Sequence, residues 1–219
     1  MTGTLYIVAT PIGNLEDITL RALDTFKSVD LIACEDTRRT KILLERHKIN
    51  KPLISFHQHS KLQKVEYLIS ELSSGKNTAL VTDAGTPGIS DPGRVLVAEA
   101  IKNEIPVVPI PGASALTALV SVSGVPMDRF SFFGFLPHKK GRETAIKRMV
   151  ESDVPVIFYE SPHRILKTLE ALKHFEGKVI VGRELTKKFE EIVRGTAKEA
   201  HEYFKDKKIQ GEFVVIYHS

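Results

Sequence analysis

The sequence has one cysteine, Cys34, among its 219 residues, so no disulfide can form within the chain. It also lacks any uninterrupted apolar run near the roughly 20 residues that a membrane-spanning helix needs. Pro11 and Gly13 lie where a signal peptide would need an unbroken apolar segment. These absences argue against a disulfide scaffold and a bilayer-spanning protein, and we expect a cytoplasmic location without a membrane partner.

Two common nucleotide-binding signatures are absent as well. The sequence contains neither the dinucleotide pattern G-x-G-x-x-G nor the phosphate-loop pattern G-x-x-x-x-G-K-[ST]. It shows no internal repeat and no low-complexity tract. A ligand with few phosphates, or none, is therefore favoured over a nicotinamide dinucleotide or a nucleoside triphosphate.

The composition is that of a globular protein. Hydrophobic residues make up 42% of the chain and charged residues 26%, which is enough apolar material for a sizeable core. The length fits two domains of ordinary size. The formal net charge of +4 permits an anionic partner without requiring one.

Basic residues are unevenly distributed along the chain. They gather in five places: Arg38, Arg39 and Lys41; Arg46, His47 and Lys48; His138, Lys139, Lys140, Arg142, Lys147 and Arg148; Lys187 and Lys188; and Lys205, Lys207 and Lys208. Each cluster, taken singly, is also explained by a solvated helix face or loop. The third cluster is the best candidate for phosphate contact, because it combines five fixed charges with the flexible Gly141.

The first half of the chain alternates short β-branched runs with helix-like segments. The expected strands are Leu5 to Ala9, Val29 to Cys34, Leu53 to Phe56, Thr78 to Thr82 and Val107 to Ile110. Apolar residues at helical spacing lie between them, as in Leu62, Val65, Leu68, Ile69 and Leu72. This alternation predicts an α/β domain with a mostly parallel sheet over residues 1–124.

The second half has its own pattern, which begins with an aromatic run after the Gly- and Pro-containing stretch at 124–129. Its expected strands are Val154 to Tyr159, Lys178 to Arg183, Glu190 to Arg194 and Glu212 to Tyr217, and its expected helices are Glu143 to Val150, His163 to Phe175 and Ala197 to Phe204. Charged residues enter these strands more freely. We therefore predict a second α/β domain over residues 125–219, with a mixed sheet that has one exposed face.

The segment from Asp83 to Gly93 follows a predicted strand and precedes the apolar helix Val95 to Ile101. It therefore lies at the carboxyl edge of the sheet, where open α/β sheets bind ligands. Its glycines allow close backbone approach, its prolines limit loop entropy, and Ser90 or Asp91 can cap the helix. A tight turn with an N-cap also explains part of it, but leaves its length unexplained.

Two further glycine turns follow strands, at Thr10 to Asn14 and at Pro111 to Ser114. Three turns at one sheet edge predict a pocket.

Polar residues also cluster at strand ends. They are Glu35 to Arg38, Ser55 to His59, Phe158 to Arg164 and Arg183 to Lys187. His57 and His59 suit a metal only with a third ligand that the sequence does not identify, so we predict no metal site and favour hydrogen bonding to substrate. For the last two segments, local ion pairing with helix capping is the competing interpretation.

Nine ordered segments together resemble one family over most of the chain. They read ATPIGNLEDITLRAL, ACEDTRRT, VTDAGTPGISDPG, VPIPGASA, GFLPHKKG, FYESPHR, RELTK, RGT and GEFV. The chain is similar to ribosomal RNA small subunit methyltransferase I, a family of cytidine 2′-O-ribose methyltransferases in the tetrapyrrole methylase superfamily. The resemblance implies two α/β domains with a cofactor cleft between them, a homodimer, and S-adenosylmethionine as the cofactor.

The resemblance also implies site residues. The cofactor residues would be Pro11, Gly13, Asp83, Ala84, Gly85, Thr86, Pro87, Ile110, Pro111, Gly112, Ala113, Ser114, Tyr159, Gly211, Glu212, Phe213 and Val214. The partner would be small-subunit ribosomal RNA or the small ribosomal subunit, contacted by Arg38, His138, Lys139, Lys140 and Arg142. Many members of the family continue beyond the segment matching GEFV, whereas this chain ends at Ser219. A tail of that kind is an expected contributor to RNA binding.

Methyl transfer to a ribose hydroxyl needs alignment, together with a base or a cation that assists the poorly acidic hydroxyl. The candidates are Glu160 with Arg164, Glu184 with Lys187, and Asp36 with Arg38. Two other functions stay open: methyl transfer to a small tetrapyrrole, and a noncatalytic RNA-binding role in ribosome assembly. The intact segment from Asp83 to Gly93 argues against the latter.

Overall fold

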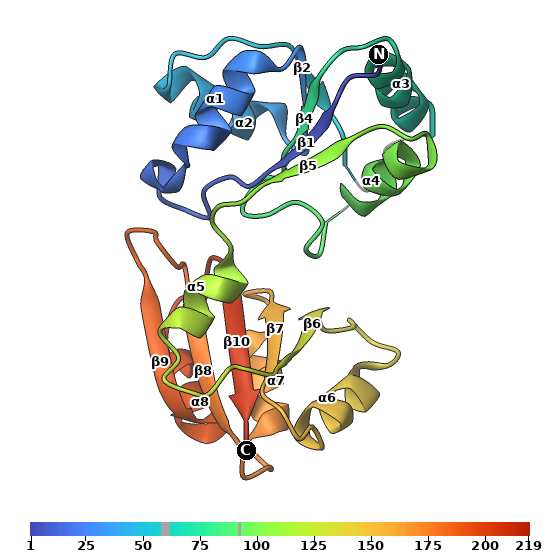
Figure 1. Ribbon diagram of the computed structural model, residues 1–219. Coiled ribbons are helices and arrows are strands. Elements are labelled where there is room, and N and C mark those ends of the chain that lie inside the picture. Colours follow the sequence, from blue (N-terminus) through green and yellow to red (C-terminus); the bar gives the residue numbers. More distant parts are fainter. Residues whose placement is uncertain (58–61, 92) are drawn as a thin grey trace. The chain divides into compact units, whose positions relative to one another are not determined.

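The computed structural model describes residues 1–57, 62–91 and 93–219. Contacts divide the chain into two compact units, Met1–Ser114 and Ala115–Ser219, and each contains one five-stranded sheet (Figure 1). The sequence placed the division after residue 124, ten residues later. The difference arises because helix α5 (Ala115–Ser121) packs on the second sheet, where buried Leu119 lies beside Gly182.

The first unit is a parallel sheet with helices on both faces. Its strands are β1 (Leu5–Val8), β2 (Leu31–Cys34), β3 (Leu53–Ser55), β4 (Thr78–Leu80) and β5 (Val107–Ile110), in the order β3-β2-β4-β1-β5. Its helices are the 3₁₀ turn η1 (Leu15–Asp17), α1 (Leu20–Ser28), α2 (Thr37–Arg46), α3 (Leu62–Ser73) and α4 (Gly93–Lys102). All neighbouring strands in it are parallel. The predicted α/β class and parallel sheet are confirmed.

Two apolar cores cover the two faces of this sheet. Helices α1 and α2 pack on one face through residues such as Phe26 and Leu44, and α3 and α4 pack on the other through residues such as Leu68 and Leu96 (Figure 1). The chain thus leaves β1 toward one face and leaves β4 toward the opposite face. Adjacent parallel strands whose connections part in this way create the ligand-binding crevice of open α/β sheets. The crevice is expected between the ends of β1 and β4.

The second unit is a mixed sheet with a different order. Its strands are β6 (Ser131–Phe135), β7 (Val156–Glu160), β8 (Lys178–Arg183), β9 (Glu191–Thr196) and β10 (Phe213–His218), in the order β6-β7-β10-β8-β9. Its other helices are α6 (Arg142–Val150), α7 (Ile165–Leu172) and α8 (Ala197–Lys205). Strands β6 and β7 are parallel, whereas β10 is antiparallel to β7 and β8, and β8 is antiparallel to β9. The predicted mixed sheet is confirmed.

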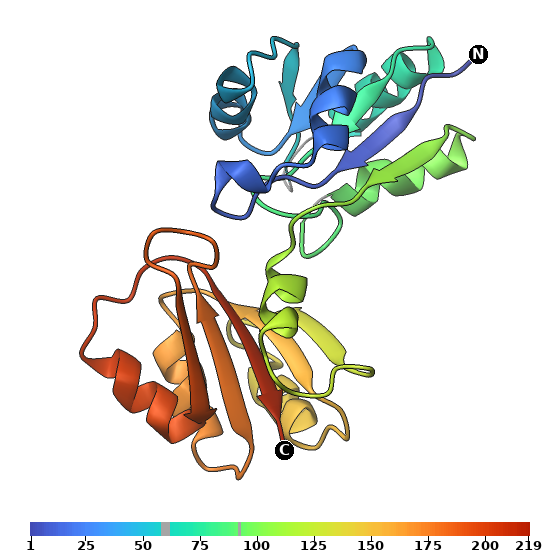
Figure 2. The same cartoon turned by 60° about the vertical axis from the view of Figure 1, so that its left-hand side comes forward.

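Alternation along β10 assigns the two faces of this sheet. Phe213, Val215 and Tyr217 join the core formed with α6, α7 and α8. Val214 lies on the opposite face, near Gly182 and Leu119 of α5. Figure 2 shows α5 beside the sheet of this unit. Both faces of β10 are therefore apolar and buried. The exposed face that the sequence predicted for this sheet is absent at this central strand, because α5 packs there. In the parts of the chain that the structure describes, no helix has the length and apolarity to cross a membrane.

Candidate functional site

The three predicted glycine turns are joined to one another at the carboxyl edge of the first sheet. Thr10, after β1, and Gly85, after β4, exchange two backbone hydrogen bonds of 3.0 Å each. The Thr10 hydroxyl also donates to the carbonyl of Thr82 over 3.2 Å. This bridge lies at the point where the connections after β1 and β4 part, so it fixes the two turns at the expected crevice.

The third turn is attached to the second through a side chain. The hydroxyl of Thr86 donates to the carbonyl oxygen of Ala113 over 3.2 Å. Gly112 lies against β1 so closely that a Cβ there would come 3.0 Å from Cβ of Ala9. The backbones of Ala84 and Gly112 belong to exposed residues. The edge therefore presents a rigid backbone wall that is open to solvent in this unit.

Conformation explains the glycines of the long turn. Gly85 has φ +84° and Gly88 has φ +91°, a region that side chains with a Cβ rarely adopt. The carboxylate of Asp91 then accepts hydrogen bonds of 2.7 Å from the backbone N–H groups of Gly88 and Gly93. Asp91 thus closes the turn and caps α4, as predicted. Pro92 lies outside the described residues.

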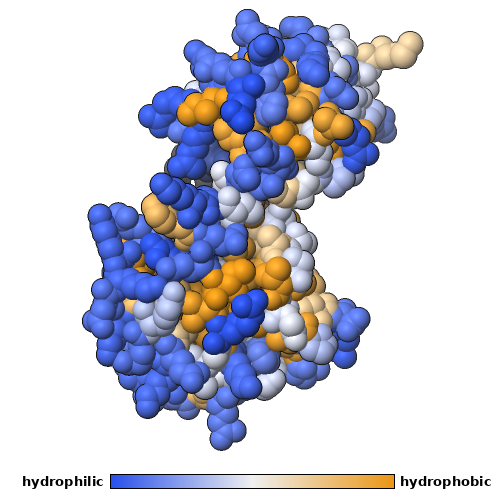
Figure 3. Space-filling model, turned by 90° about the vertical axis from the view of Figure 1, so that its left-hand side faces the viewer, coloured by the Kyte–Doolittle hydropathy of each residue, from blue (hydrophilic) through white to orange (hydrophobic). Residues whose placement is uncertain are grey.

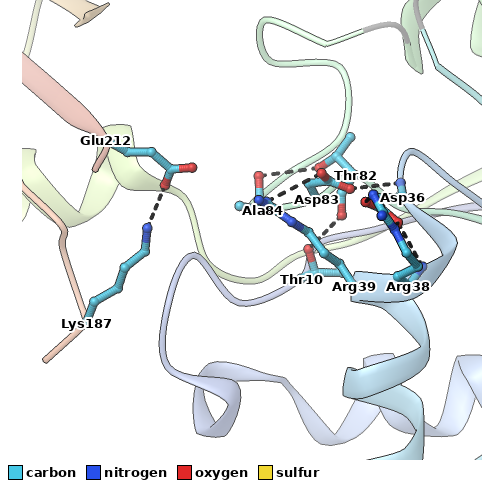
Figure 4. Close-up of polar contacts among 9 residues, drawn as sticks. All are labelled: Thr10, Asp36, Arg38, Arg39, Thr82, Asp83, Ala84, Lys187 and Glu212. Atoms are coloured by element: carbon cyan, nitrogen blue, oxygen red, sulfur yellow. Dashed lines mark hydrogen bonds and ion pairs between the residues drawn. The ribbon is translucent and has the colours of Figure 1, made fainter. Parts of the chain in front are cut away.

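Asp83 connects the long turn to helix α2 (Figure 4). Its Oδ1 accepts a hydrogen bond from the backbone N–H of Asp36 over 2.9 Å, and its Oδ2 lies 3.4 Å from Nη1 of Arg39. Asp36 in turn caps α2 by accepting from the N–H of Arg38 over 2.8 Å. The ACEDTRRT segment therefore supports the turn that follows β4.

Charge around Asp83 shifts two neighbouring carboxyl groups in opposite directions. Burial, followed by the negative charge of Asp83, raises the pKa of Glu35. Hydrogen bonds from the side chain and backbone of Arg38 lower the pKa of Asp36 to about 2. Arg38 itself is highly exposed and holds Asp36 through two guanidinium nitrogens, at 3.0 and 2.7 Å. Arg38 therefore lies on the surface, where an RNA contact was predicted for it. The carboxylate of Asp36 is engaged by Arg38.

In the second unit, Glu160 and Arg142 are not where the sequence analysis expected them. Glu160 has a fully buried carboxylate that accepts from Arg164 (2.8 Å), Arg142 (3.2 Å), Thr168 (2.7 Å) and its neighbour's backbone N–H (2.8 Å). Every oxygen of the carboxylate is thus occupied, so Glu160 is not poised to accept a substrate proton. Arg142 was expected at the RNA-binding surface, but it is only 7% exposed because its guanidinium neutralises Glu160.

The same network holds the segment that precedes α6. Arg164 donates to the carbonyl of Leu136 over 2.8 Å, and Arg142 donates to the carbonyl of Pro137 over 3.3 Å. The residues that follow, His138, Lys139 and Lys140, are exposed. The structure thus brings these three to the surface on an anchored backbone.

Glu184 and Lys187 form a second ionic cluster, with Glu212. The ammonium of Lys187 lies 2.8 Å from Glu184. It lies 3.0 Å from Glu212, as Figure 4 shows. Burial lowers the pKa of Lys187, but its hydrogen bonds to the two carboxylates outweigh this, and the net shift is upward. For Glu184, burial is outweighed by the bond from Lys187, and its pKa is lowered. Both groups keep their charges and partial access to solvent.

The backbone of this loop is strained. Glu184 has φ +51° and Thr186 has φ +66°, conformations that cost roughly 1–2 kcal/mol for residues with a Cβ. Glu184 also receives a 3.0 Å hydrogen bond from the N–H of Glu212. A Cβ on Gly211 would come within 2.3 Å of the Glu184 carboxylate carbon. Strain that surrounding contacts maintain in this way is typical of functional segments.

The remaining predicted cofactor residues of the second unit differ in accessibility. Phe213 and Val214 are each 3% exposed, so their side chains belong to the interior. Tyr159 is half-buried against Phe132 and Phe135. Among the predicted cofactor residues of this unit, the half-buried Tyr159 and the exposed Glu212 are those whose side chains can reach a ligand. In the first unit, Pro11, Pro87, Ile110 and Ser114 are buried, whereas Gly13 and Pro111 are exposed.

Across residues 1–57, 62–91 and 93–219, no three His, Cys, Asp or Glu side chains gather as a metal-binding group. His57 is within that part, while Gln58 and His59 lie outside the described residues.

The sequence did not predict the supporting contacts of several residues at the site. Thr10, Thr82 and Arg39 support the turns, and Thr168 completes the Glu160 network. The position of Thr168 could have been inferred in part from the sequence. It lies four residues after Arg164 on the predicted helix, and therefore on the same face as Arg164. The contacts of Thr10 and Thr82 span 72 residues and leave no local pattern.

Comparison with known proteins places the chain among methylases. The family model "Tetrapyrrole (Corrin/Porphyrin) Methylases" matches residues 4–201. Ribosomal RNA small subunit methyltransferase I of Halalkalibacterium halodurans is 49% identical over 217 residues, which cover 98% of this chain and 75% of that protein. The protein of the same name from Thermotoga maritima is 46% identical over 216 residues, covering 98% and 97%.

Solved structures share the fold at low identity. A cobalt precorrin-4 methyltransferase aligns with a TM-score of 0.72 at 15% identity, covering 98% of this chain and 94% of that one. Diphthine synthase aligns with a TM-score of 0.76 at 15% identity, covering 98% and 89%. A uroporphyrin-III C-methyltransferase from Thermus thermophilus, complexed with S-adenyl homocysteine, aligns with a TM-score of 0.68 at 15% identity, covering 98% and 97%.

Proposed function

Because the chain belongs to the tetrapyrrole methylases, and within them to the ribosomal RNA small subunit methyltransferase I family, we propose a specific reaction for it. It transfers a methyl group from S-adenosylmethionine to the 2′-hydroxyl of a cytidine ribose in small-subunit (16S) ribosomal RNA. The observation that carries the proposal is the 46–49% identity to relatives of that name over 98% of the chain. An RNA of this kind is met in the cytoplasm, and we further propose that the chain works there as a homodimer.

The first unit supports the cofactor half of the proposal. S-adenosylmethionine carries no phosphate, and the turns after β1, β4 and β5 form a backbone wall without a phosphate loop. Ala84 and Gly112 expose backbone groups that suit hydrogen bonding to a nucleoside and an amino acid. The Thr10 to Gly85 bridge fixes that wall before any ligand arrives, so little ordering cost falls on binding. These residues fit the cofactor, and we assign them to hold it.

The second unit offers the side chains for the transfer. When bound, S-adenosylmethionine supplies an electrophilic methyl group on a sulfonium. Lys187 keeps its positive charge and stabilises the oxygen of the ribose hydroxyl as it becomes negative. Glu184, ionised and beside Lys187, accepts the hydroxyl proton. Glu160 and Arg164 act instead on the backbone of residues 136 and 137, through the buried network.

Methyl transfer to a tetrapyrrole is the alternative that the fold alone permits. The solved tetrapyrrole enzymes are 15% identical to the chain, a level that supports a common fold and nothing narrower. The relatives of 46–49% identity favour RNA over a tetrapyrrole, and the exposed His138, Lys139 and Lys140 suit contact with RNA phosphates. A noncatalytic role is opposed by the joined turns, because a vestigial pocket has no need of them.

The proposal is tested by mapping ribose methylation. Small ribosomal subunits from a strain that lacks this protein are incubated with the purified chain and S-adenosylmethionine, and 2′-O-methyl groups are mapped along the RNA. The expected result is one new mark on a cytidine, absent when the cofactor is omitted. A parallel reaction uses uroporphyrin-type substrates. Methylation of these and not of the RNA overturns the proposal.

A further inference from the structure

A bulge in edge strand β6 changes the direction of one aromatic side chain. Phe132 pairs with Ile157 and Phe135 pairs with Tyr159 on β7, and the register shifts between the two pairs. Gly134 within this shift has φ +61°. In a regular strand, residues 132 and 135 would face opposite sides of the sheet, because side chains alternate. The bulge instead brings both toward Tyr159.

The result is a cluster of three aromatic rings at the edge of the sheet. The ring centroid of Tyr159 lies 5.1 Å from that of Phe132 and 5.5 Å from that of Phe135. Phe132 and Tyr159 are half-buried, whereas Phe135 is 54% exposed. Hydrophobic residues also gather on the β9 side of this unit, with hydrophilic residues around them (Figure 3). Unlike a mobile surface side chain, the exposed ring of Phe135 is packed against Tyr159.

The basic segment begins directly beyond this ring. Leu136 and Pro137 follow Phe135, and their carbonyls are held by Arg164 and Arg142. His138, Lys139 and Lys140 come next and are exposed. Because Arg142 and Arg164 are drawn into the pairing with Glu160, the basic side chains that reach solvent in this segment are those of His138, Lys139 and Lys140. The ring of Phe135 and the side chains of Lys139 and Lys140 therefore belong to one segment whose backbone is anchored at residues 136 and 137.

We propose that Phe135 is a base-stacking residue of the RNA-binding surface, which receives an unpaired nucleobase while Lys139 and Lys140 contact the neighbouring phosphates. This inference rests on the proposed function, and it specifies how the substrate RNA is bound. Single-stranded RNA is bound by this combination, an aromatic face for the base and basic side chains for the backbone. In-line methyl transfer needs a ribose whose orientation is fixed, and stacking of an unpaired base on Phe135 would hold its nucleotide in one orientation.

Charge distinguishes this occupant from others. A purely apolar partner would leave Lys139 and Lys140 unused beside the ring, whereas RNA engages both features. The adenine of the cofactor is also a nucleobase that stacks on aromatic rings, so the test must separate the two sources of a base. RNA is favoured because the lysines match a chain of phosphates, which S-adenosylmethionine lacks.

The test compares Phe135→Ala, Phe135→Trp and Phe175→Ala, the last replacing another exposed phenylalanine. Steady-state methylation of small subunits gives KM and kcat, and calorimetry gives the Kd of S-adenosylmethionine. Loss of stacking in Phe135→Ala should raise the RNA KM by about tenfold or more and leave cofactor Kd unchanged. Phe135→Trp should restore the wild-type KM, and Phe175→Ala should match the wild type.

Other outcomes overturn the inference. A wild-type KM in Phe135→Ala excludes stacking on RNA, and a raised cofactor Kd assigns the ring to the adenine. A change in sedimentation of Phe135→Ala assigns it to contact between copies of the chain. If the wild-type protein does not methylate RNA at all, the proposed function fails instead, and the two failures are thereby distinguished. Gly134→Ala, measured with the same assays and a melting curve, should also raise KM because it disturbs the bulge.

Discussion

The guanidinium of Arg142 reaches the carboxylate of Glu160 over 3.2 Å, at a place where the side chains are 8% and 0% exposed. Arg164 approaches the other carboxylate oxygen to 2.8 Å. Two cations and one anion are therefore withdrawn from water together. Such a group is stable only while its partners are complete, because an unpaired charge in the interior keeps its desolvation cost.

Removal of the shared carboxylate should destabilise the protein strongly. Glu160→Ala leaves two buried guanidinium groups without their anion and should lower the free energy of unfolding by about 3–5 kcal/mol. Urea denaturation followed by circular dichroism measures this. Glu176→Ala, at an exposed position, is the control and should change the same quantity by less than about 0.5 kcal/mol. Equal effects of the two substitutions would contradict the buried network.

Substitution of two glycines in the long turn distinguishes the effect of backbone strain from that of a steric contact. Gly85→Ala and Gly88→Ala both place a Cβ at positive φ, but only at position 85 does it meet other atoms, Ile12 Cγ2 at 3.3 Å. Both should lose about 1–2 kcal/mol of stability. Gly85→Ala should in addition weaken S-adenosylmethionine binding, because it pushes apart the bridged turns. Titration calorimetry measures the affinity, and an equal loss in both variants would mean that the bridge is irrelevant to binding.

Glu35 should make stability depend on pH. Its pKa is raised by burial and by Asp83 above the ordinary value of 4.5. The folded state therefore keeps a proton that the unfolded state has lost, and stability falls as pH rises through this interval. Glu35→Gln cannot lose that proton. The variant should gain stability relative to the wild type as pH increases above about 4.5. Urea titrations at several pH values measure the difference, and a constant difference would show that Glu35 has an ordinary pKa.

Lys187 and its neighbour provide a matched pair for the chemical step. Lys187→Ala removes the cation that lies between Glu184 and Glu212, whereas Lys188→Ala removes an exposed lysine. We expect the first to lower kcat by about 100-fold with little change in cofactor Kd, a loss typical of one electrostatic group. The second should keep the wild-type kcat. Single-turnover methylation with preformed enzyme and RNA measures the step, and an unchanged rate in Lys187→Ala would remove it from the proposed mechanism.

Much of the fold was predictable, because most strands coincide with short runs of apolar and β-branched residues that can be recognised in the sequence. Runs such as Val107 to Ile110 coincide with strand β5, and Lys178 to Arg183 coincides with β8. Helices α2 and α5 and strand β6 were not predicted. The residues of α5 were assigned to the first domain, whereas the helix packs on the second sheet. Seven residues carry too few apolar positions for their pattern to say which sheet they cover.

The candidate site was predictable in its turns and less so in its side chains. Gly85 and Asp91 lie in a turn that the sequence marked, and their conformation and capping agree with it. Glu160 was predicted as a catalytic candidate, and Arg142 as an RNA contact. Both residues were expected to be accessible, because charged side chains are usually exposed. They are instead buried together as an ion pair, and this pairing is not visible in the sequence because the two residues are 18 positions apart.

The sequence by itself determined the two α/β patterns, the three glycine turns and the basic segment, because each depends on residues close together in the chain. Tertiary structure decided which charges reach the surface. It paired Arg142 and Arg164 with Glu160, joined Thr10 to Gly85, and turned Phe135 outward beside Tyr159. Burial and hydrogen bonding depend on neighbours that only the folded chain supplies, and these neighbours decided which of the predicted residues are free to meet a ligand.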